Sequence, residues 1–240
     1  MRRRRVLLAA VLVTLARSES ALAIELGGLS GPPRPPLRCV HAQAGPPREP
    51  GPFRAPDLVE VISLDPTIRL DVRYATDRNF VGRAVYPEAR AFLQRAAAEA
   101  VVRAHRALAK EGYGVLVFDG YRPWSVTKLF WDLTPRAKRA FVANPKEGSK
   151  HNRGSAVDLS LYDLTSGREV EMPSAYDEMS PRAYPGYPGG TPEQRARRDL
   201  LRAAMEREGF TVESNEWWHF NYKDWRQYPI LDVPFSAIRR

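Results

Sequence analysis

Two short segments constrain this chain more than any other feature, because each holds a histidine beside a carboxylate. Residues 149–158 contain His151 and Asp158, and residues 216–219 contain Glu216 and His219. Zinc in hydrolases typically takes three protein nitrogen or oxygen ligands and keeps a fourth position for water. We therefore predict a zinc site made by His151, Asp158 and His219, with one ion per chain. Glu216 is then free to act as a base, and the fold must bring both segments together.

Each segment, taken alone, could also serve a purely structural role. An aspartate inside an apolar strand needs a metal, an arginine or a hydrogen-bond network as its partner. His151 and Asp158 are seven residues apart, which would stack them on a helix, but Gly154 favours a loop followed by a strand. The second segment is compatible with an aromatic core strand that carries one hydrogen-bonded histidine. The two segments together favour the metal site.

The N-terminus has the pattern of a secretory signal. Four arginines at positions 2–5 precede an apolar run over residues 6–16 and the small-residue sequence Ala21-Leu22-Ala23. This order predicts residues 1–23 as a signal peptide that is cleaved after Ala23, with a periplasmic or cell-envelope location. The apolar run is too short for a permanent membrane span. A retained membrane anchor is the alternative.

Charge and cysteine content limit the class of partner. Removal of residues 1–23 takes away five arginines and one glutamate, which leaves 32 basic and 27 acidic residues, a net charge of +5 instead of +9. No basic run is interleaved with aromatic residues, so no nucleic-acid partner is expected. The single cysteine, Cys39, excludes an intramolecular disulfide.

Residues 24–56 are rich in proline and glycine, a composition that favours an extended linker or tail without packing. Cys39 and His41 lie inside it and are interpreted as incidental exposed residues. Residues 57–240 are long enough for one domain with a substantial core. We therefore expect a single catalytic domain there; sequence does not indicate the oligomeric state.

Periodicity predicts the elements of that domain. Strands are expected at 58–64, 68–74, 114–119, 155–162 and near 218–222, and helices at 87–111, 123–132, 135–142 and from 191 to Gly209. Pro87 suits the first turn of the first helix, Thr134 the cap of the third, and Thr191 that of the last. His105 is interpreted as an ordinary helix residue. The mixed order predicts an α+β fold with a central, mainly antiparallel sheet flanked by helices.

Arg122 is the next candidate, because it follows a buried strand and a Gly-Tyr turn. A cation at this position would point into the open end of the sheet and can stabilise the oxyanion that forms when a carbonyl is attacked. A surface salt bridge is the alternative for Arg122.

These residues resemble the D-alanyl-D-alanine dipeptidases, zinc enzymes related to the D,D-carboxypeptidases and to the hedgehog-type fold. The resemblance covers about residues 70–229. Its motifs are residues 71–76 with Asn79-Phe80 and Gly82, residues 118–123, the 151–158 block and residues 216–219.

The resemblance implies a role for each matching position. His151, Asp158 and His219 correspond to the zinc ligands, Glu216 to the general base and acid, and Arg122 to the transition-state cation. Three further positions are implied to bind substrate. Tyr74 and Asp177 correspond to contacts with the free ammonium group, and Ser149 to a contact with the free carboxylate. Lys150 departs from the small polar residue expected beside Ser149.

We therefore expect zinc-dependent hydrolysis of the dipeptide D-alanyl-D-alanine to two D-alanines. A D,D-carboxypeptidase acting on peptidoglycan stem peptides, or a non-catalytic zinc-stabilised binding module, are the alternatives. Family members that confer vancomycin resistance act on newly made dipeptide in the cytoplasm, a pool that an exported enzyme would miss. An exported member would instead serve cell-wall turnover or the scavenging of released dipeptide.

Overall fold

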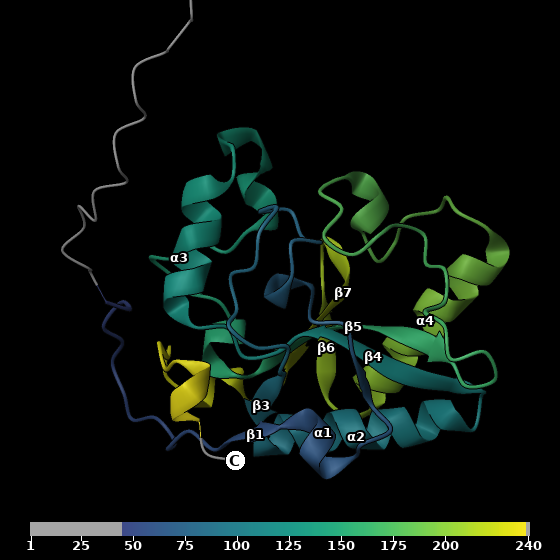
Figure 1. The fold of residues 1–240 in the computed structure, drawn as a ribbon, viewed down its shortest axis with the longest axis horizontal. Helices are drawn as coiled ribbons and strands as arrows, with labels where there is room; N and C mark the ends of the chain where they lie inside the picture. Colours follow the sequence, from purple (N-terminus) through teal and green to yellow (C-terminus); the bar gives the residue numbers. More distant parts are fainter. Residues whose placement is uncertain (1–44, 239–240) are drawn as a thin grey trace, which may run out of the picture. The chain divides into compact units, whose positions relative to one another are not determined.

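A computed structural model describes residues 45–238. Its centre is a five-stranded sheet in which only the first pair, β2 and β4, is parallel and every other neighbouring pair is antiparallel (Figure 1). In spatial order the strands are β2 (Arg69–Leu70), β4 (Tyr113–Asp119), β5 (Ala156–Asp163), β7 (Glu216–Tyr222) and β6 (Phe210–Glu213). The predicted α+β fold with a mainly antiparallel sheet is confirmed.

The two predicted N-terminal strands are much shorter than expected. Strand β1 (Leu58–Glu60) passes directly into the short helix α1 (Val61–Leu64), and β2 is followed by a 3₁₀ turn, η1 (Arg73–Ala75). The apolar residues of both stretches are needed in the core, but only the first part of each has a strand partner. The prediction of strands over 58–64 and 68–74 was therefore wrong for the second half of each.

The first long helix, α2 (Arg95–Ala109), begins eight residues later than predicted. Residues Phe92–Gln94 form strand β3 instead and pair antiparallel with β1, so Pro87 lies outside the helix. The predicted apolar stripe is nevertheless buried, because α2 packs against β4 and α4 (Pro192–Arg207). Figure 1 shows α2 and α1 along one side of the sheet, and α3 (Trp124–Leu133) on the other.

Of two predicted helix caps, the one at Thr191 is confirmed and the one at Thr134 is not. Thr191 and Gln194 form the predicted capping box at the start of α4. Thr134 does not cap the segment after it: its hydroxyl donates to the Phe130 carbonyl at the end of α3, and residues Arg136–Phe141 form a 3₁₀ helix, η2, after Pro135. The prediction for Thr134 was wrong because this residue ends α3: its backbone N–H and its hydroxyl both donate to the Phe130 carbonyl.

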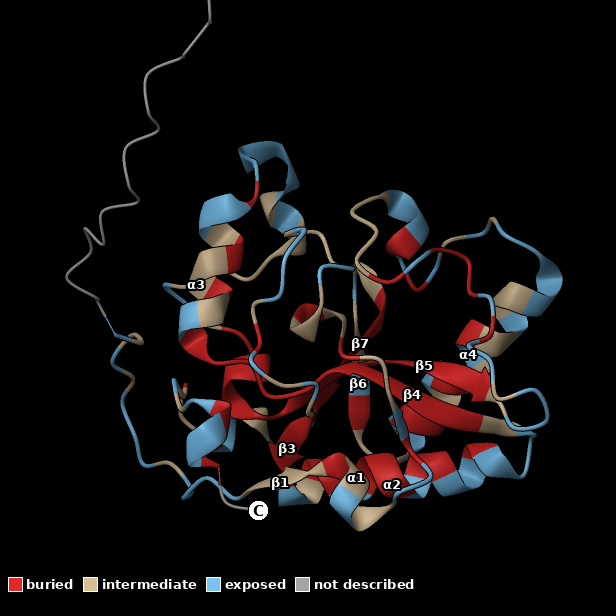
Figure 2. Cartoon of the chain, viewed as in Figure 1, coloured by how far each residue is buried: buried red, intermediate tan, exposed pale blue. Residues whose placement is uncertain are grey.

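The middle strands carry the polar residues that matter for function. β4, β5 and β7 are almost entirely buried, as the red ribbons in Figure 2 show. Asp158 of β5 lies directly opposite His219 of β7. The register between β4 and β5 shifts between Val117 and Asp119, so Asp119 also lies opposite Asp158. One end of the central sheet therefore gathers two aspartates and a histidine.

Four further 3₁₀ turns lie within residues 45–238: η3 (His151–Arg153), η4 (Pro181–Ala183), η5 (Trp225–Gln227) and η6 (Phe235–Ala237). Residues 45–56 have no regular element, yet Glu49 accepts hydrogen bonds from Arg153 and from the Ile230 backbone. Between residues 45 and 238, no helix combines the length and apolarity needed to cross a membrane. The predicted signal peptide, Cys39 and His41 lie outside the described residues.

Candidate functional site

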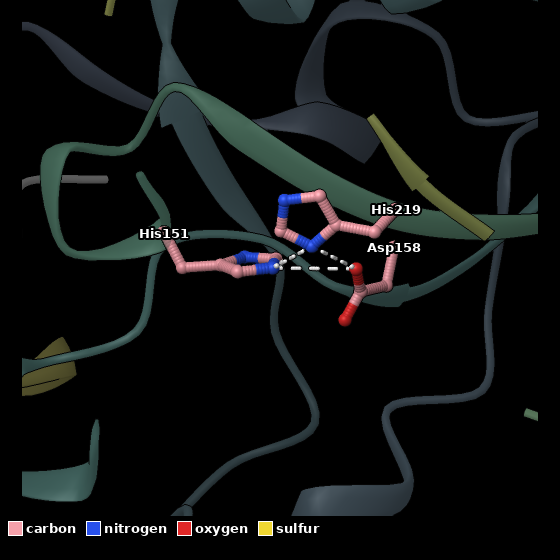
Figure 3. A group of neighbouring side chains, drawn as sticks. All are labelled: His151, Asp158 and His219. Atoms are coloured by element: carbon pink, nitrogen blue, oxygen red, sulfur yellow. Dashed lines mark hydrogen bonds and ion pairs between the residues drawn. The ribbon is translucent and has the colours of Figure 1, made fainter. Parts of the chain in front are cut away.

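The three predicted metal ligands converge on one point, as Figure 3 shows. His151 lies in the turn before β5, Asp158 on β5, and His219 on the neighbouring strand β7. The distance from Asp158 Oδ1 is 3.2 Å to His151 Nε2 and 3.0 Å to His219 Nδ1, and the two nitrogens are 3.1 Å apart. Ligands about 2.0–2.2 Å from a tetrahedral zinc ion are separated by roughly 3.3–3.5 Å, close to these values.

Hydrogen bonds determine which ring nitrogens face this point. His151 Nδ1 lies 2.7 Å from the Gly120 carbonyl oxygen, which can only accept, so Nδ1 carries the proton and Nε2 presents its lone pair. His219 Nε2 donates to Asn221 Oδ1 at 2.9 Å, because the Asn221 amide nitrogen is used as donor to Glu213. His219 Nδ1 is then free as a ligand. Such outer contacts orient metal-binding histidines in proteins.

The surroundings of Asp158 indicate whether these three residues could bind a metal ion. Its Oδ2 accepts a hydrogen bond from the Tyr176 hydroxyl at 3.0 Å, but its buried Oδ1 has no hydrogen-bond donor. Burial by itself raises the pKa of Asp158, whereas positive charge on the two neighbouring imidazoles lowers it well below its ordinary value. A divalent cation between the same groups would supply that positive charge in place of the imidazole protons. A buried, ionised oxygen that faces two imidazole lone pairs fits a divalent cation, and the two-nitrogen, one-oxygen donor set suits zinc.

The turn that carries His151 depends on a glycine. Gly154 ends η3 with a φ of +66°, in the left-handed region that disfavours other residues. A β-carbon at this position would also clash with the Leu58 side chain. The chain can therefore reverse from His151 into β5 within a few residues, which brings His151 back to Asp158 as the sequence predicted.

Glu216 begins β7 and lies beside the three ligands, with its Oε2 3.6 Å from His219 Nδ1. Burial raises the pKa of Glu216 to about 8, and the charges of Asp158 and Asp177 act in the same direction, whereas His219 opposes them. A carboxyl group with a pKa near neutrality can both accept and donate a proton at working pH.

Arg122 is buried behind Asp158 rather than paired at the surface. Its Nε and one terminal nitrogen donate to Asp119 Oδ2 at 2.9 and 2.6 Å, and that terminal nitrogen is 3.7 Å from Asp158 Oδ2. The guanidinium also lies 4.9 Å from the centre of the Phe130 ring. The alternative of a surface salt bridge is excluded, because Arg122 and Asp119 are both buried.

The three predicted substrate-binding residues lie on the same cavity. The Tyr74 hydroxyl donates to Asp177 Oδ2 at 2.8 Å. The pKa of Asp177 is raised to about 7, first by burial and then by the charge of Asp158, although the Tyr74 hydrogen bond opposes this. Ser149 is the third, and its hydroxyl accepts from the His151 backbone N–H at 3.2 Å. One cavity of about 800 Å³ is lined by all eight predicted site residues: Tyr74, Arg122, Ser149, His151, Asp158, Asp177, Glu216 and His219.

Several residues that hold this group in place were not predicted from the sequence. Asp119 binds Arg122, Tyr176 binds Asp158, and Asn221 binds His219. Two of them had a local signal: Asn221 follows His219 by two residues in the same strand and so shares its face, and Asp119 precedes Arg122 by three. Tyr176 had none, because its contact spans two distant segments. His105 is buried on α2 away from this cavity and fully hydrogen-bonded, as an ordinary helix residue.

Comparison with known proteins points to one family. A family model described as D-ala-D-ala dipeptidase matches residues 54–236. A D-alanyl-D-alanine dipeptidase of Escherichia coli K12 is 32% identical over 182 residues, which cover 76% of this chain and 93% of the relative. One from Enterococcus faecium is 35% identical over 190 residues, which cover 70% and 92%.

Solved structures are more distant. The LdcB LD-carboxypeptidase has 22% sequence identity and a TM-score of 0.44 over 72% of this chain and 71% of that protein. The D,D-dipeptidase VanXYg, in complex with a D-Ala-D-Ala phosphinate analogue, has 20% identity and a TM-score of 0.35 over 59% and 52%. The assignment therefore depends on the sequence matches.

Proposed function

The chain belongs to the D-alanyl-D-alanine dipeptidase family, and from that premise we propose how its residues act and where. It is a zinc metallopeptidase that hydrolyses D-alanyl-D-alanine. One observation supports these roles most strongly. A nitrogen of His151, a nitrogen of His219 and the Asp158 oxygen that has no hydrogen-bond donor meet at one point, and Glu216 lies beside it.

In this proposal, one zinc ion per chain is held by His151 Nε2, Asp158 Oδ1 and His219 Nδ1. This is the group of converging ligand atoms found among residues 45–238. When bound, zinc supplies Lewis-acid polarisation of the scissile carbonyl and lowers the pKa of water. Tyr176 and Asn221 keep the ligands oriented through their hydrogen bonds.

Glu216 serves as general base and then as general acid. It takes a proton from the attacking water and delivers it to the leaving amine. The raised pKa of Glu216 favours its holding that proton until the amine leaves, and a divalent cation beside it would favour the ionised form that the first step needs. Its place at the start of β7, beside a ligand but not itself among the three, leaves the carboxyl group free to exchange that proton.

Arg122 stabilises the negative charge that develops on the substrate carbonyl oxygen. Asp119 fixes the guanidinium from behind, so little reorganisation is needed when charge develops. Burial strengthens this interaction, because the local dielectric is lower than that of water.

The two ends of a dipeptide have separate partners on the cavity wall. Asp177, with Tyr74, receives the free ammonium group, and Ser149 receives the free carboxylate. A blocked amine would leave the half-buried Asp177 carboxylate without its charged partner, which penalises acylated substrates. Free dipeptides are therefore preferred.

We also propose that the enzyme acts outside the cytoplasm, because residues 1–23 have the pattern of a secretory signal. The substrate would then be dipeptide released during cell-wall turnover rather than newly made dipeptide. Fractionation of cells that produce the native chain tests this: recovery mainly in the cytoplasm, with the N-terminus retained, would refute it.

The function itself is tested by D-alanine release from D-alanyl-D-alanine with zinc, compared with the N-acetylated dipeptide and a wall pentapeptide. Activity on the free dipeptide alone is expected. The pentapeptide arm is needed because a cavity of about 800 Å³ lies in the upper part of the range for small-molecule sites, with room for more than a dipeptide. Cleavage of pentapeptide would favour a D,D-carboxypeptidase, and inactivity on every substrate a binding module.

A further inference from the structure

A buried arginine fixes the turn that carries His151 from its outer side. Arg153 lies two residues after His151 in η3 and is 6% exposed. Its guanidinium donates to the Tyr228 carbonyl at 2.6 Å and to Glu49 Oε2 at 3.1 Å, and its second terminal nitrogen donates to Glu49 Oε1. The Trp225 ring lies 5.4 Å from the guanidinium. Glu49 is thus the carboxylate that neutralises this charge.

Glu49 comes from a part of the chain that the sequence predicted to be unpacked. Its Oε2 also accepts the Ile230 backbone N–H at 3.1 Å, and the Arg54 backbone N–H donates to the Gln227 carbonyl at 2.7 Å. Residues 49–54 are therefore tied to the segment that follows β7. Glu49 precedes residue 54, where the family match begins, so this contact is made from outside the matched region.

Arg153 and His151 cannot move independently. The backbone N–H of Arg153 donates to the Lys150 carbonyl at 3.1 Å, and that of Gly154 donates to the His151 carbonyl at 3.0 Å. These two bonds make residues 150–154 one tight turn. A shift of the Arg153 backbone therefore changes where His151 Nε2 lies.

The inner side of the same turn has a different anchor. The Asn152 amide donates to the Arg122 carbonyl and to Thr127 Oγ1, both at 2.8 Å. The Gln94 amide also donates to the Arg153 carbonyl at 2.8 Å. The turn is thus held by several neutral hydrogen bonds and, on its outer side, by a partly buried ion pair. Removal of one partner of a buried pair leaves the other charge uncompensated and drives it towards water. Without Glu49, the uncompensated Arg153 guanidinium would move towards solvent, and the backbone of residues 150–154 would shift with it.

We propose that Glu49 is a positioning residue of the metal centre: it holds Arg153 and thereby sets His151 for zinc. This role rests on the proposed zinc site. It makes the end of the proline-rich segment part of the catalytic domain, although the family match does not include it. Groups that hydrogen-bond directly to a metal-binding residue typically change metal affinity or activity by about 10–100-fold. Because Glu49 acts through Arg153, an effect at the lower end of that range is expected.

The test compares two variants of the full chain. Glu49→Gln keeps the shape of the side chain and removes its charge. The control, Asp57→Asn, changes a carboxylate eight residues later in the chain that pairs with Arg95 at the surface. Zinc affinity is measured by competition with a chromogenic chelator, well below the unfolding temperature of each protein, and kcat and KM are measured at limiting free zinc. About tenfold weaker zinc binding and a lower kcat with unchanged KM are expected for Glu49→Gln only.

Unchanged zinc affinity in a folded Glu49→Gln variant, with only a lower melting temperature, would overturn the proposal. If Glu49→Gln does not fold, Glu49→Asp is measured in the same way, because its shorter side chain cannot reach both Arg153 and the Ile230 N–H; wild-type affinity there would equally overturn it. Since zinc binding is read directly, a wild-type chain that binds zinc but releases no D-alanine would refute the proposed function and leave this test intact.

Discussion

The buried histidines on the two sides of the sheet have opposite surroundings. On α2, His105 accepts the Val115 backbone N–H at Nδ1 and lies 2.9 Å from the Thr67 hydroxyl at Nε2, so both ring nitrogens have hydrogen-bond partners. At the other site, His151 and His219 each use one nitrogen in a hydrogen bond and direct the second towards Asp158 Oδ1, which has no donor. Burial alone does not distinguish a structural histidine from a ligand; the unsatisfied atom does.

The same substitution at each site should therefore have different effects. His151→Ala removes a ligand and is expected to abolish stoichiometric zinc binding and D-alanine release while the chain stays folded. His105→Ala leaves a buried N–H of Val115 without its acceptor, which costs about 1–3 kcal/mol of stability, and should keep zinc and activity. Zinc content and the free energy of unfolding are measured for both variants. Loss of zinc from His105→Ala would contradict the distinction between a structural histidine and a ligand.

Glu216→Gln tests the separation of ligand from base. It should lower kcat by about 10²–10⁴-fold, the usual contribution of general acid–base catalysis, with zinc content unchanged. Loss of zinc together with activity would instead make Glu216 a fourth ligand. Activity and metal content are measured on the same preparation.

Arg122→Lys keeps a positive charge but cannot reproduce the two-nitrogen contact with Asp119. Loss of a preorganised oxyanion contact typically lowers kcat by about 10²–10³-fold. We expect a reduction of that order, with zinc retained. A KM effect with kcat unchanged would assign Arg122 to substrate binding alone.

Zinc removal should lower the stability of the protein only when the His151 site is intact. Free zinc at 100 times its dissociation constant stabilises a folded protein by about 2.7 kcal/mol if the unfolded chain does not bind it. A chelator should therefore lower the melting temperature of the wild type and of His105→Ala, but not that of His151→Ala. An equal decrease in His151→Ala would place the stabilising metal elsewhere.

The smallest expected effect is the pH dependence at His105. Burial lowers its pKa below the ordinary value of 6.5, although Asp65 opposes this. The unfolded chain then takes up a proton at a higher pH than the folded chain, so the stabilisation is complete above about pH 6.5 and declines below it. The difference in unfolding free energy between wild type and His105→Ala should shrink between pH 7 and pH 5. A difference that grows with falling pH would contradict it.

Local signals predicted the elements that carry the site better than those at the start of the domain. β5, β7 and α4 were found because alternation and the capping box at Thr191 are encoded within each segment. The start of α2 was misplaced because Phe92–Gln94 pairs with β1, a partner that lies some thirty residues earlier in the chain. A contact at that distance leaves no local pattern.

The residues of the candidate site differ in the same way. His151, Asp158, Glu216 and His219 are conspicuous by residue type and spacing, and the structure brings them together. The groups that hold them were harder to find: the contact between Glu49 and Arg153 joins a proline-rich segment to a buried turn, and no composition rule predicts it. The sequence indicates the reactive residues more readily than the residues that hold them in position.

The direct pairing of Asp158 with His219 across β5 and β7 also has a consequence for the order of folding. These two ligands are about 60 residues apart in the chain and meet only when the two strands have paired, a long-range step that is slow compared with helix formation. Zinc therefore cannot nucleate this domain as it does a zinc finger. Metal uptake is expected late in maturation, by a chain whose sheet is already formed, and its rate would report completed folding rather than drive it.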